Sequence, residues 1–223
     1  TFEISSATNH AVRQHDEFTV SAWIYREGDA GHHEQIWRDQ VSNGSSCSEF
    51  NVRNSGSQED KLGFYISGGP SFNANTALAE QTWYHAVFRY DGSVGKIFLN
   101  GVDDGAQSGG ASTTNSCYPH IGGRMYTDGD ESFYGKIDEL ISWNKAVSDA
   151  DILNYYQTGV IPDLDNIQMY HDFEDTSNAS SITQTSVVDY DSSLSKMKYG
   201  TLGALDEGLP AVQEQSQTTT ILD

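Results

Sequence analysis

The stretch from Trp83 to Gly101 constrains the fold of this chain more than any other part of the sequence. It reads WYHAVFRYDGSVGKIFLNG and contains two runs of alternating residues, closed by the turn sequences Asp91-Gly92 and Asn100-Gly101. Glycine at such positions can take the positive φ of a tight turn. The stretch therefore predicts an antiparallel meander whose aromatic face needs a second sheet to cover it. That face is formed by Tyr84, Ala86, Phe88 and Tyr90.

Alternation with a period of two also occurs outside the meander. FTVSAWIY, Phe18 to Tyr25, alternates strictly and predicts a strand. Residues 148–156 predict a helix with Ser148 as its N-cap and Gly159 just past its end. Residues 103–117 read as a long loop of small residues, and residues 120–123 as the opening of a strand. Further short strands are predicted at 2–5, 35–38, 50–53, 62–66, 133–143, 167–173, 186–190 and 198–202.

The charge balance excludes several classes of partner. Among 223 residues, 12 Lys and Arg stand against 32 Asp and Glu, a formal net charge of −20. Nucleic-acid phosphates would be repelled, and an anionic membrane surface is disfavoured for the same reason. No stretch approaches the roughly 20 apolar residues of a membrane span. The surplus carboxylates fit a solvated acidic surface, grouped ligands for Ca²⁺, or both.

The two cysteines, Cys47 and Cys117, lie in the polar, loop-like sequences NGSSCSEF and TTNSCYPH. One such pair fits a loop-to-loop disulfide formed in an oxidising compartment, and two free thiols are the alternative. Zinc-type cysteine and histidine spacings are absent from the sequence.

The order of these motifs resembles the laminin G-like (concanavalin A-like, pentraxin-related) jelly-roll domain. The resemblance rests on FTVSAWIY, the meander, the IGG at 121–123 and FYGKIDELISWNKAVSDADI, and covers about residues 18–159. It implies an all-β, concanavalin A-like jelly-roll sandwich of two antiparallel sheets with one short helix. The final TTTILD resembles the closing strand of repeats in large bacterial surface adhesins, which implies flanking domains in a larger surface protein.

The tail after Pro162 has two interpretations. MYHDFED, VVDYDSS and KYGTLGA are similar to what usually opens such a domain. Either the tail, about 163–223, completes the sheets of a single domain spanning 1–223, or it opens a second domain. We expect the first, because residues 1–17 offer too few strands and the termini of a jelly roll lie side by side.

Some members of this superfamily are glycosidases or lyases, so the resemblance also admits catalysis. The laminarinase-like enzymes carry E-x-D-x-E, which directs alternate carboxylates of one strand into a sugar cleft. The nearest approach here is Asp138-Glu139, whose side chains would point to opposite faces of a regular strand. We therefore expect that the chain is not an enzyme, and a polysaccharide-degrading enzyme is kept as an alternative.

Two loops, 26–38 and 124–131, are the predicted binding loops. Aromatic rings stack on sugars, and polar side chains bond their hydroxyls. His32-His33-Glu34 lacks an H-E-x-x-H or triad context, which favours a polar loop over a metal or acid–base site. The candidate ligand-binding residues are Trp37, Arg38, Arg124, Tyr126 and His33.

Acidic turns with glycine suggest calcium sites, since Ca²⁺ takes six to eight oxygen ligands. Pentraxin relatives bind calcium just after the strand that matches 120–123, where this chain instead has Gly123 and Arg124. Acidic turns without metal are the alternative. The candidate metal ligands are Asp103, Asp104, Asp128, Asp130 and Glu131.

These observations predict a calcium-dependent, lectin-like adhesion module that is extracellular, either secreted or at the cell surface. Its expected partner is carbohydrate or a glycoconjugate on a cell surface or matrix. A protein- or peptide-binding module is the alternative from another class.

Overall fold

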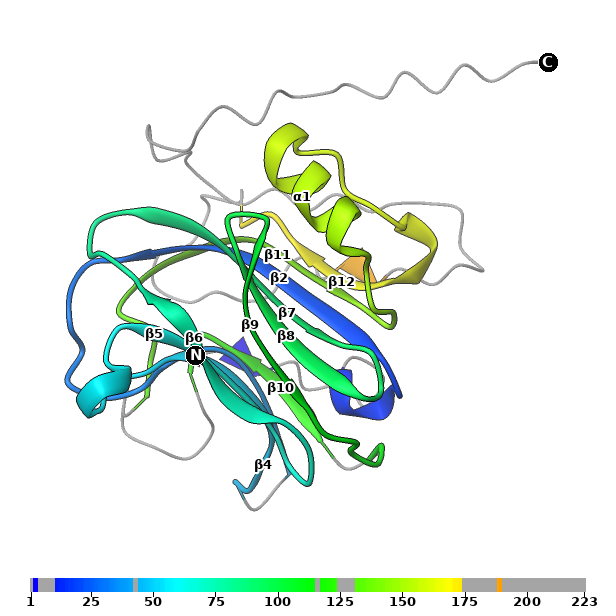
Figure 1. Ribbon diagram of the computed structural model, residues 1–223, viewed down its shortest axis with the longest axis horizontal. Coiled ribbons are helices and arrows are strands. Elements are labelled where there is room, and N and C mark those ends of the chain that lie inside the picture. Colours follow the sequence, from blue (N-terminus) through cyan, green and yellow to red (C-terminus); the bar gives the residue numbers. More distant parts are fainter. Residues whose placement is uncertain are drawn as a thin grey trace.

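A computed structural model describes residues 2–3, 11–41, 44–114, 117–123, 131–173 and 188–189. These residues form two antiparallel sheets packed face to face, with helix α1 (Asp149–Thr158) outside them (Figure 1). The concanavalin A-like sandwich predicted from the sequence is thereby confirmed. Within the described ranges, no helix is long and apolar enough to cross a membrane.

The first sheet has six strands in the order β1-β10-β3-β4-β5-β6 within the described residues. Their bounds are β1 Phe2–Glu3, β10 Tyr118–Ile121, β3 Glu34–Gln40, β4 Ser46–Val52, β5 Lys61–Ile66 and β6 Ser71–Ala77. The second sheet has seven strands there, in the order β13-β12-β11-β2-β7-β8-β9. Their bounds are β13 Val188–Asp189, β12 Ile167–His171, β11 Gly135–Trp143, β2 Phe18–Arg26, β7 Trp83–Tyr90, β8 Val94–Leu99 and β9 Val102–Ser108.

The main core fills the space between the two sheets. The aromatic face of β7 points into it, as the meander predicted, and the apolar face of β2 lies beside it. Phe50 of β4 stacks on Phe88 of β7 with ring centroids 4.8 Å apart, so aromatic contacts join the two sheets.

Helix α1 covers the opposite face of the seven-stranded sheet (Figure 1). Ile152 and Tyr155 of the helix pack in a second apolar cluster with Trp143 of β11. Ser148 accepts a hydrogen bond from the Asp151 backbone N–H at 3.1 Å, and Gly159 ends the helix with φ of 71°. The predicted caps are therefore confirmed, and both faces of β2 and β7 are covered.

Two edge strands show where reasoning from the sequence was wrong. Residues 103–117 were expected to form a loop, yet β9 pairs with β8 along the sheet edge. β6 at the edge of the other sheet was not predicted. The side chains of both strands are mostly exposed, so neither strand has the apolar alternation that marks a half-buried one. Residues 120–123 also close a strand instead of opening one, because β10 ends at Ile121.

Strands from the tail join the seven-stranded sheet. β12 pairs with β11, and β13 pairs with β12. The strand expected at 198–202 and the TTTILD segment lie outside the described residues, and the single domain over 1–223 stays a prediction.

Cys47 and Cys117 form a disulfide, as one of the two interpretations of the sequence predicted. The bond joins β4 to the residue before β10 across 70 positions, with a Cα–Cα distance of 6.4 Å. Both cysteines are buried beside Ala11 in a small apolar cluster.

Candidate functional site

The outer face of the six-stranded sheet is polar. Trp37, Phe50 and Phe64 lie opposite one another in register and point into the core, so their strand neighbours point outward. The outward side chains that concern us are called the outer polar face: Gln35, Arg38, Gln40, Glu49, Asn51, Arg53, Tyr65, Asn73 and His120.

An ion-paired arginine lies at the centre of the outer polar face. Arg38 Nη1 is 2.7 Å from Glu131 Oε2, and Nη2 is 3.3 Å from Glu49 Oε1. Gln35 Nε2 donates to the same Glu131 oxygen at 3.2 Å. Only 6% of the Arg38 side chain is exposed. Two carboxylates therefore neutralise the guanidinium charge of Arg38 and leave one negative charge over.

Several amide groups of this face are buried without a hydrogen bond to the protein. They are both polar atoms of Gln40 and of Asn51 and the Oε1 atom of Gln35, and Arg38 Nε is in the same condition. Buried polar groups normally have partners, and each one left without costs about 1–3 kcal/mol. The side chains of Gln35, Gln40 and Asn51 have no exposed surface, so ordered water is the partner that suits these atoms.

Gly63 leaves space for these side chains in the middle of the face. A Cβ atom at this position would lie 2.6 Å from Asn51 Oδ1 and 2.4 Å from Arg53 Nε. Arg53 Nε in turn donates to Asn73 Oδ1 at 3.0 Å. The side chains of Asn51 and Arg53 therefore lie over the backbone of β5 at Gly63.

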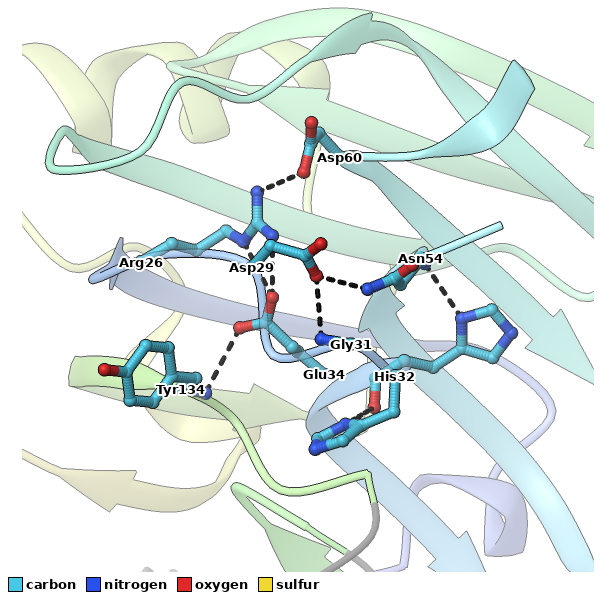
Figure 2. A network of polar contacts seen from close by, with 9 residues as sticks. Arg26, Asp29, Gly31, His32, Glu34, Asn54, Asp60 and Tyr134 are labelled. Atoms are coloured by element: carbon cyan, nitrogen blue, oxygen red, sulfur yellow. Dashed lines mark hydrogen bonds and ion pairs between the residues drawn. The ribbon is translucent and has the colours of Figure 1, made fainter. Parts of the chain in front are cut away.

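The end of the sandwich next to this face is held by a buried network centred on Arg26 and Glu34 (Figure 2). Arg26 Nε and Nη2 donate to Glu34 Oε1 at 2.9 and 2.7 Å, and Nη1 donates to Asp60 at 2.7 Å. Glu34 Oε2 accepts from the Tyr134 backbone N–H at 3.1 Å. Burial raises the pKa of Glu34, and the bonds from Arg26 oppose that shift. Every Glu34 oxygen is used, so this network is structural.

The same network fixes the loop between β2 and β3 (Figure 2). The Asn54 backbone N–H donates to His33 Nδ1 at 2.9 Å, and the Gly31 N–H donates to Asp29 at 2.8 Å. Burial, and then the charge of Arg53, lower the pKa of His33 and favour the neutral ring that accepts this bond. His33 is thereby held beside the outer polar face.

Three of the predicted site residues lie close together in the structure, and a fourth does not belong to the site. Arg38 and Glu131 are ion-paired on the outer polar face, and His33 lies at its edge. Trp37 was predicted as a ligand contact, and this is wrong because its side chain is fully buried. As the strand neighbour of Arg38 it points into the core, where its Nε1 donates to Asp39 at 3.0 Å. Arg124, Tyr126, Asp128 and Asp130 lie outside the described residues.

Asp103 and Asp104 do not form the predicted acidic turn, because both belong to strand β9. Asp103 is ion-paired with Lys96 at 2.8 Å, and Asp104 accepts from the Thr76 hydroxyl at 2.8 Å. In the part of the chain that the structure describes, no three His, Cys, Asp or Glu side chains are grouped to hold a metal ion.

The Asp138-Glu139 pair departs from the regular strand assumed for it. A bulge interrupts the pairing of β11 with β2 after Asp138, and Glu139 has φ of 47°. Glu139 accepts from the Tyr170 hydroxyl at 2.6 Å, while Asp138 lies opposite Trp23, whose ring stacks on Tyr156 of α1. Both carboxylates therefore lie on the helix side of the sheet. The expectation of opposite faces was wrong, because a bulge adds a residue.

The amide residues of the outer polar face were missed by sequence reasoning. Gln35 and Asn51 lie opposite one another on β3 and β4, 16 positions apart along the chain. The sequence did signal that every second residue of these short strands is polar. Only the pairing of the strands shows that these polar residues lie on one face of the sheet.

The fold and this surface define a two-sheet, concanavalin A-like β-sandwich with a polar face on one sheet. Residues 3–153 match the family model described as the concanavalin A-like lectin/glucanases superfamily, and the chain belongs to this family. A search of curated proteins found no match.

Solved structures share the fold at low sequence identity. A candidate carbohydrate-binding protein from Bacteroides ovatus is 18% identical with a TM-score of 0.59, and the match covers 85% of this chain and 54% of that one. This chain thus spans about half the length of that protein. Domain 4 of an extracellular arabinanase from Geobacillus stearothermophilus, in complex with arabinotriose, is 18% identical with a TM-score of 0.50, covering 65% and 68%. A Trypanosoma rangeli sialidase is 11% identical with a TM-score of 0.50, covering 66% and 24%.

Proposed function

We propose that this chain is a carbohydrate-binding module without catalytic activity and that the outer polar face is its binding surface. The observation that carries this proposal is the group of partly exposed polar and aromatic side chains on this face, Glu49, Arg53, Tyr65 and Asn73. Sugar hydroxyls would bond to the exposed polar atoms of these side chains, and ordered water can partner the buried amides of the same face. The half-buried ring of Tyr65 offers an apolar surface on the same face.

The fold neighbours support a sugar ligand, since one is described as a candidate carbohydrate-binding protein and another was solved with arabinotriose. Glycosidases occur among these neighbours as well. Binding is favoured over hydrolysis here because Glu49 and Glu131 both make ion pairs with Arg38, so neither carboxylate is free to contact a glycosidic oxygen.

The location and the metal belong to the same proposal. We place the module outside the cell, secreted or at the cell surface as an adhesion module, and the Cys47–Cys117 disulfide supports an oxidising compartment. Calcium dependence is proposed on the acidic run that includes Asp128 and Asp130.

The test is a glycan array probed with the labelled protein and with two variants. Tyr65→Ala removes the partly exposed aromatic ring of this face, and we expect it to lower the affinity for the array's best ligand at least tenfold. Asn154→Ala, on the exposed side of α1, is the matched control and should bind like the unchanged protein. Thermal unfolding of both variants shows whether they are folded. Equal binding by the folded Tyr65→Ala variant would remove this surface from the proposal, and hydrolysis of any arrayed glycan would overturn the absence of catalysis.

A further inference from the structure

We infer that the glycan bound by the outer polar face carries a carboxylate, and that Arg53 binds this carboxylate through its two terminal nitrogens. The inference rests on the proposed function and adds the chemical class of the sugar. The ligand is an acidic glycan whose charge is a carboxylate, as in uronic and sialic acids.

Arg53 and Lys61 form a positive corner of the outer polar face. Both are partly exposed, and within the described residues neither makes an ion pair. They are neighbours, since the Arg53 backbone N–H donates to the Lys61 carbonyl at 2.8 Å. Leu62 points into the core, so Lys61 points outward beside Arg53. The ion pairs of the described residues use other cations: Arg26, Arg38, Arg89, Lys96 and Lys145.

The guanidinium group of Arg53 is held in a fixed position. Its Nε donates to Asn73 Oδ1 at 3.0 Å, and Nε lies where a Cβ atom of Gly63 would otherwise be crowded, at 2.4 Å. Within the described residues, Nη1 and Nη2 make no hydrogen bond, and neither atom is buried. The two nitrogens therefore form a planar fork that matches the two oxygens of a carboxylate. Because the side chain is already anchored, little of its conformational entropy remains to be lost on binding.

The carboxylates that border the positive corner have other partners. Asp60, whose backbone N–H donates to the Arg53 carbonyl, is ion-paired with Arg26 at 2.7 Å. Asp29 accepts a hydrogen bond from the side chain of Asn54, the residue after Arg53 (Figure 2). The terminal nitrogens of Arg53 thus remain available to a carboxylate of the ligand.

The negative charge left over around Arg38 does not dominate at the positive corner. It is shared by Glu49 and Glu131, and Glu49 precedes Arg53 by four positions, about 13 Å along an extended chain. The Debye length at physiological ionic strength is about 8 Å, so a charge at that distance is largely screened, as is most of the net charge. After the effect of burial, the charge of Arg53 lowers the pKa of His33 more than the charge of Glu131 raises it. The local field is therefore positive.

Tyr65 supplies the second half of the site. Gly63 and Tyr65 lie on the same face of β5, two residues and about 7 Å apart along the strand. The ring of Tyr65 is partly exposed and can stack on the apolar face of a sugar. A sugar stacked there would hold its carboxylate towards the guanidinium of Arg53, which lies over Gly63.

The experiment compares acidic glycans with neutral counterparts of the same shape. Trigalacturonate, trimannuronate and sialyllactose are each titrated by calorimetry beside their carboxyl-reduced forms, in one calcium-containing buffer. An array of neutral and sulfated glycans is probed in parallel. We expect at least one of the acidic glycans to bind, and each one that binds to exceed its reduced form at least tenfold.

The outcomes separate the two proposals. Preferred binding of the carboxyl-reduced, neutral or sulfated glycans would overturn the carboxylate inference and leave carbohydrate binding standing. Absence of binding to every glycan would overturn the proposed function itself, and this inference with it.

Variants of Arg53 test its role directly. Arg53→Gln removes the charge and the fork, and we expect the affinity ratio of acidic to neutral ligand to fall at least tenfold. Arg53→Lys keeps the charge without the fork and should give an intermediate ratio. Lys145→Gln, between β11 and α1, changes the net charge by the same amount and should leave the ratio unchanged. An unaltered ratio in a folded Arg53→Gln variant would contradict the assignment.

Discussion

Arg26 of β2 and Glu34 of β3 form a buried ion pair that joins the two sheets, with 2.7 Å between Nη2 and Oε1. Their side chains are only 2% and 1% exposed. Because the pair connects neighbouring ends of opposing sheets, it fixes both ends of the loop between β2 and β3 (Figure 2). His33 belongs to this loop and accepts a hydrogen bond from the Asn54 backbone N–H.

Removing one partner of this pair should destabilise the fold. We expect Glu34→Ala to lower the free energy of unfolding by about 3 kcal/mol, the lower end of the range for a broken buried ion pair, since Asp60 still contacts Arg26. Urea denaturation measures the change. Lys145→Ala, which breaks the exposed Lys145–Asp163 pair, is the control and should have a much smaller effect. An equally small loss for Glu34→Ala would show that the pair contributes little.

His85 should make stability fall in acid. It is buried beneath α1 with Nε2 2.7 Å from Ser21 Oγ, and burial lowers its pKa to about 3. The unfolded histidine has a pKa of about 6.5, so between these values the unfolded state binds the extra proton. The free energy of unfolding therefore decreases as pH falls, by at most about 1.4 kcal/mol per pH unit from this residue. His85→Gln should remove this contribution from urea denaturation curves recorded at pH 4 to 7, and an unaltered pH slope would refute it.

Asp39 should act in the opposite direction. Burial raises its pKa to about 7, although it accepts hydrogen bonds from Ser48 and Trp37. An unfolded aspartate has a pKa of about 3.9, so the folded state holds the proton in between and loses this stabilisation as pH rises towards 7. Asp39→Asn should therefore make stability increase more steeply with pH than in the unchanged protein. Chemical-shift titration of the Asp39 carboxyl carbon is an independent check, and a midpoint near 4 would contradict the prediction.

The disulfide should provide a large share of the stability. Replacing Cys47 and Cys117 together by serine opens a link across 70 positions, and we expect a loss of about 4 kcal/mol. Thermal unfolding with and without reductant gives the same comparison without a mutation. The double variant should be insensitive to reductant, and an unchanged midpoint in the reduced parent would show that the link is dispensable.

Calcium removal tests the proposed metal dependence. We expect EDTA to abolish glycan binding and millimolar Ca²⁺ to restore it. Asp128→Ala combined with Asp130→Ala should have the effect of EDTA, whereas Asp165→Ala, at an exposed position, should not. Binding that persists in EDTA and in the double variant would refute calcium dependence and leave the proposal of sugar binding unchanged.

The sequence by itself determined the parts of this protein that depend on local pattern. Strict alternation located β2 and β7 and the face of each that enters the core. The N-cap serine and the terminal glycine located α1, since capping depends on residues a few positions apart. Two cysteines in loop-like sequence were enough to favour a disulfide.

Only the tertiary structure decided which residues share a surface. Trp37 and Arg38 are neighbours in sequence, yet one is in the core and the other on the outer polar face, because β3 is covered on its inner side by the second sheet. Asp138 and Glu139 share a face only because of a bulge. The register of strands far apart in the chain is set by long-range packing and pairing, and local sequence patterns do not predict it. The face formed by Gln35 and Asn51 depends on that register.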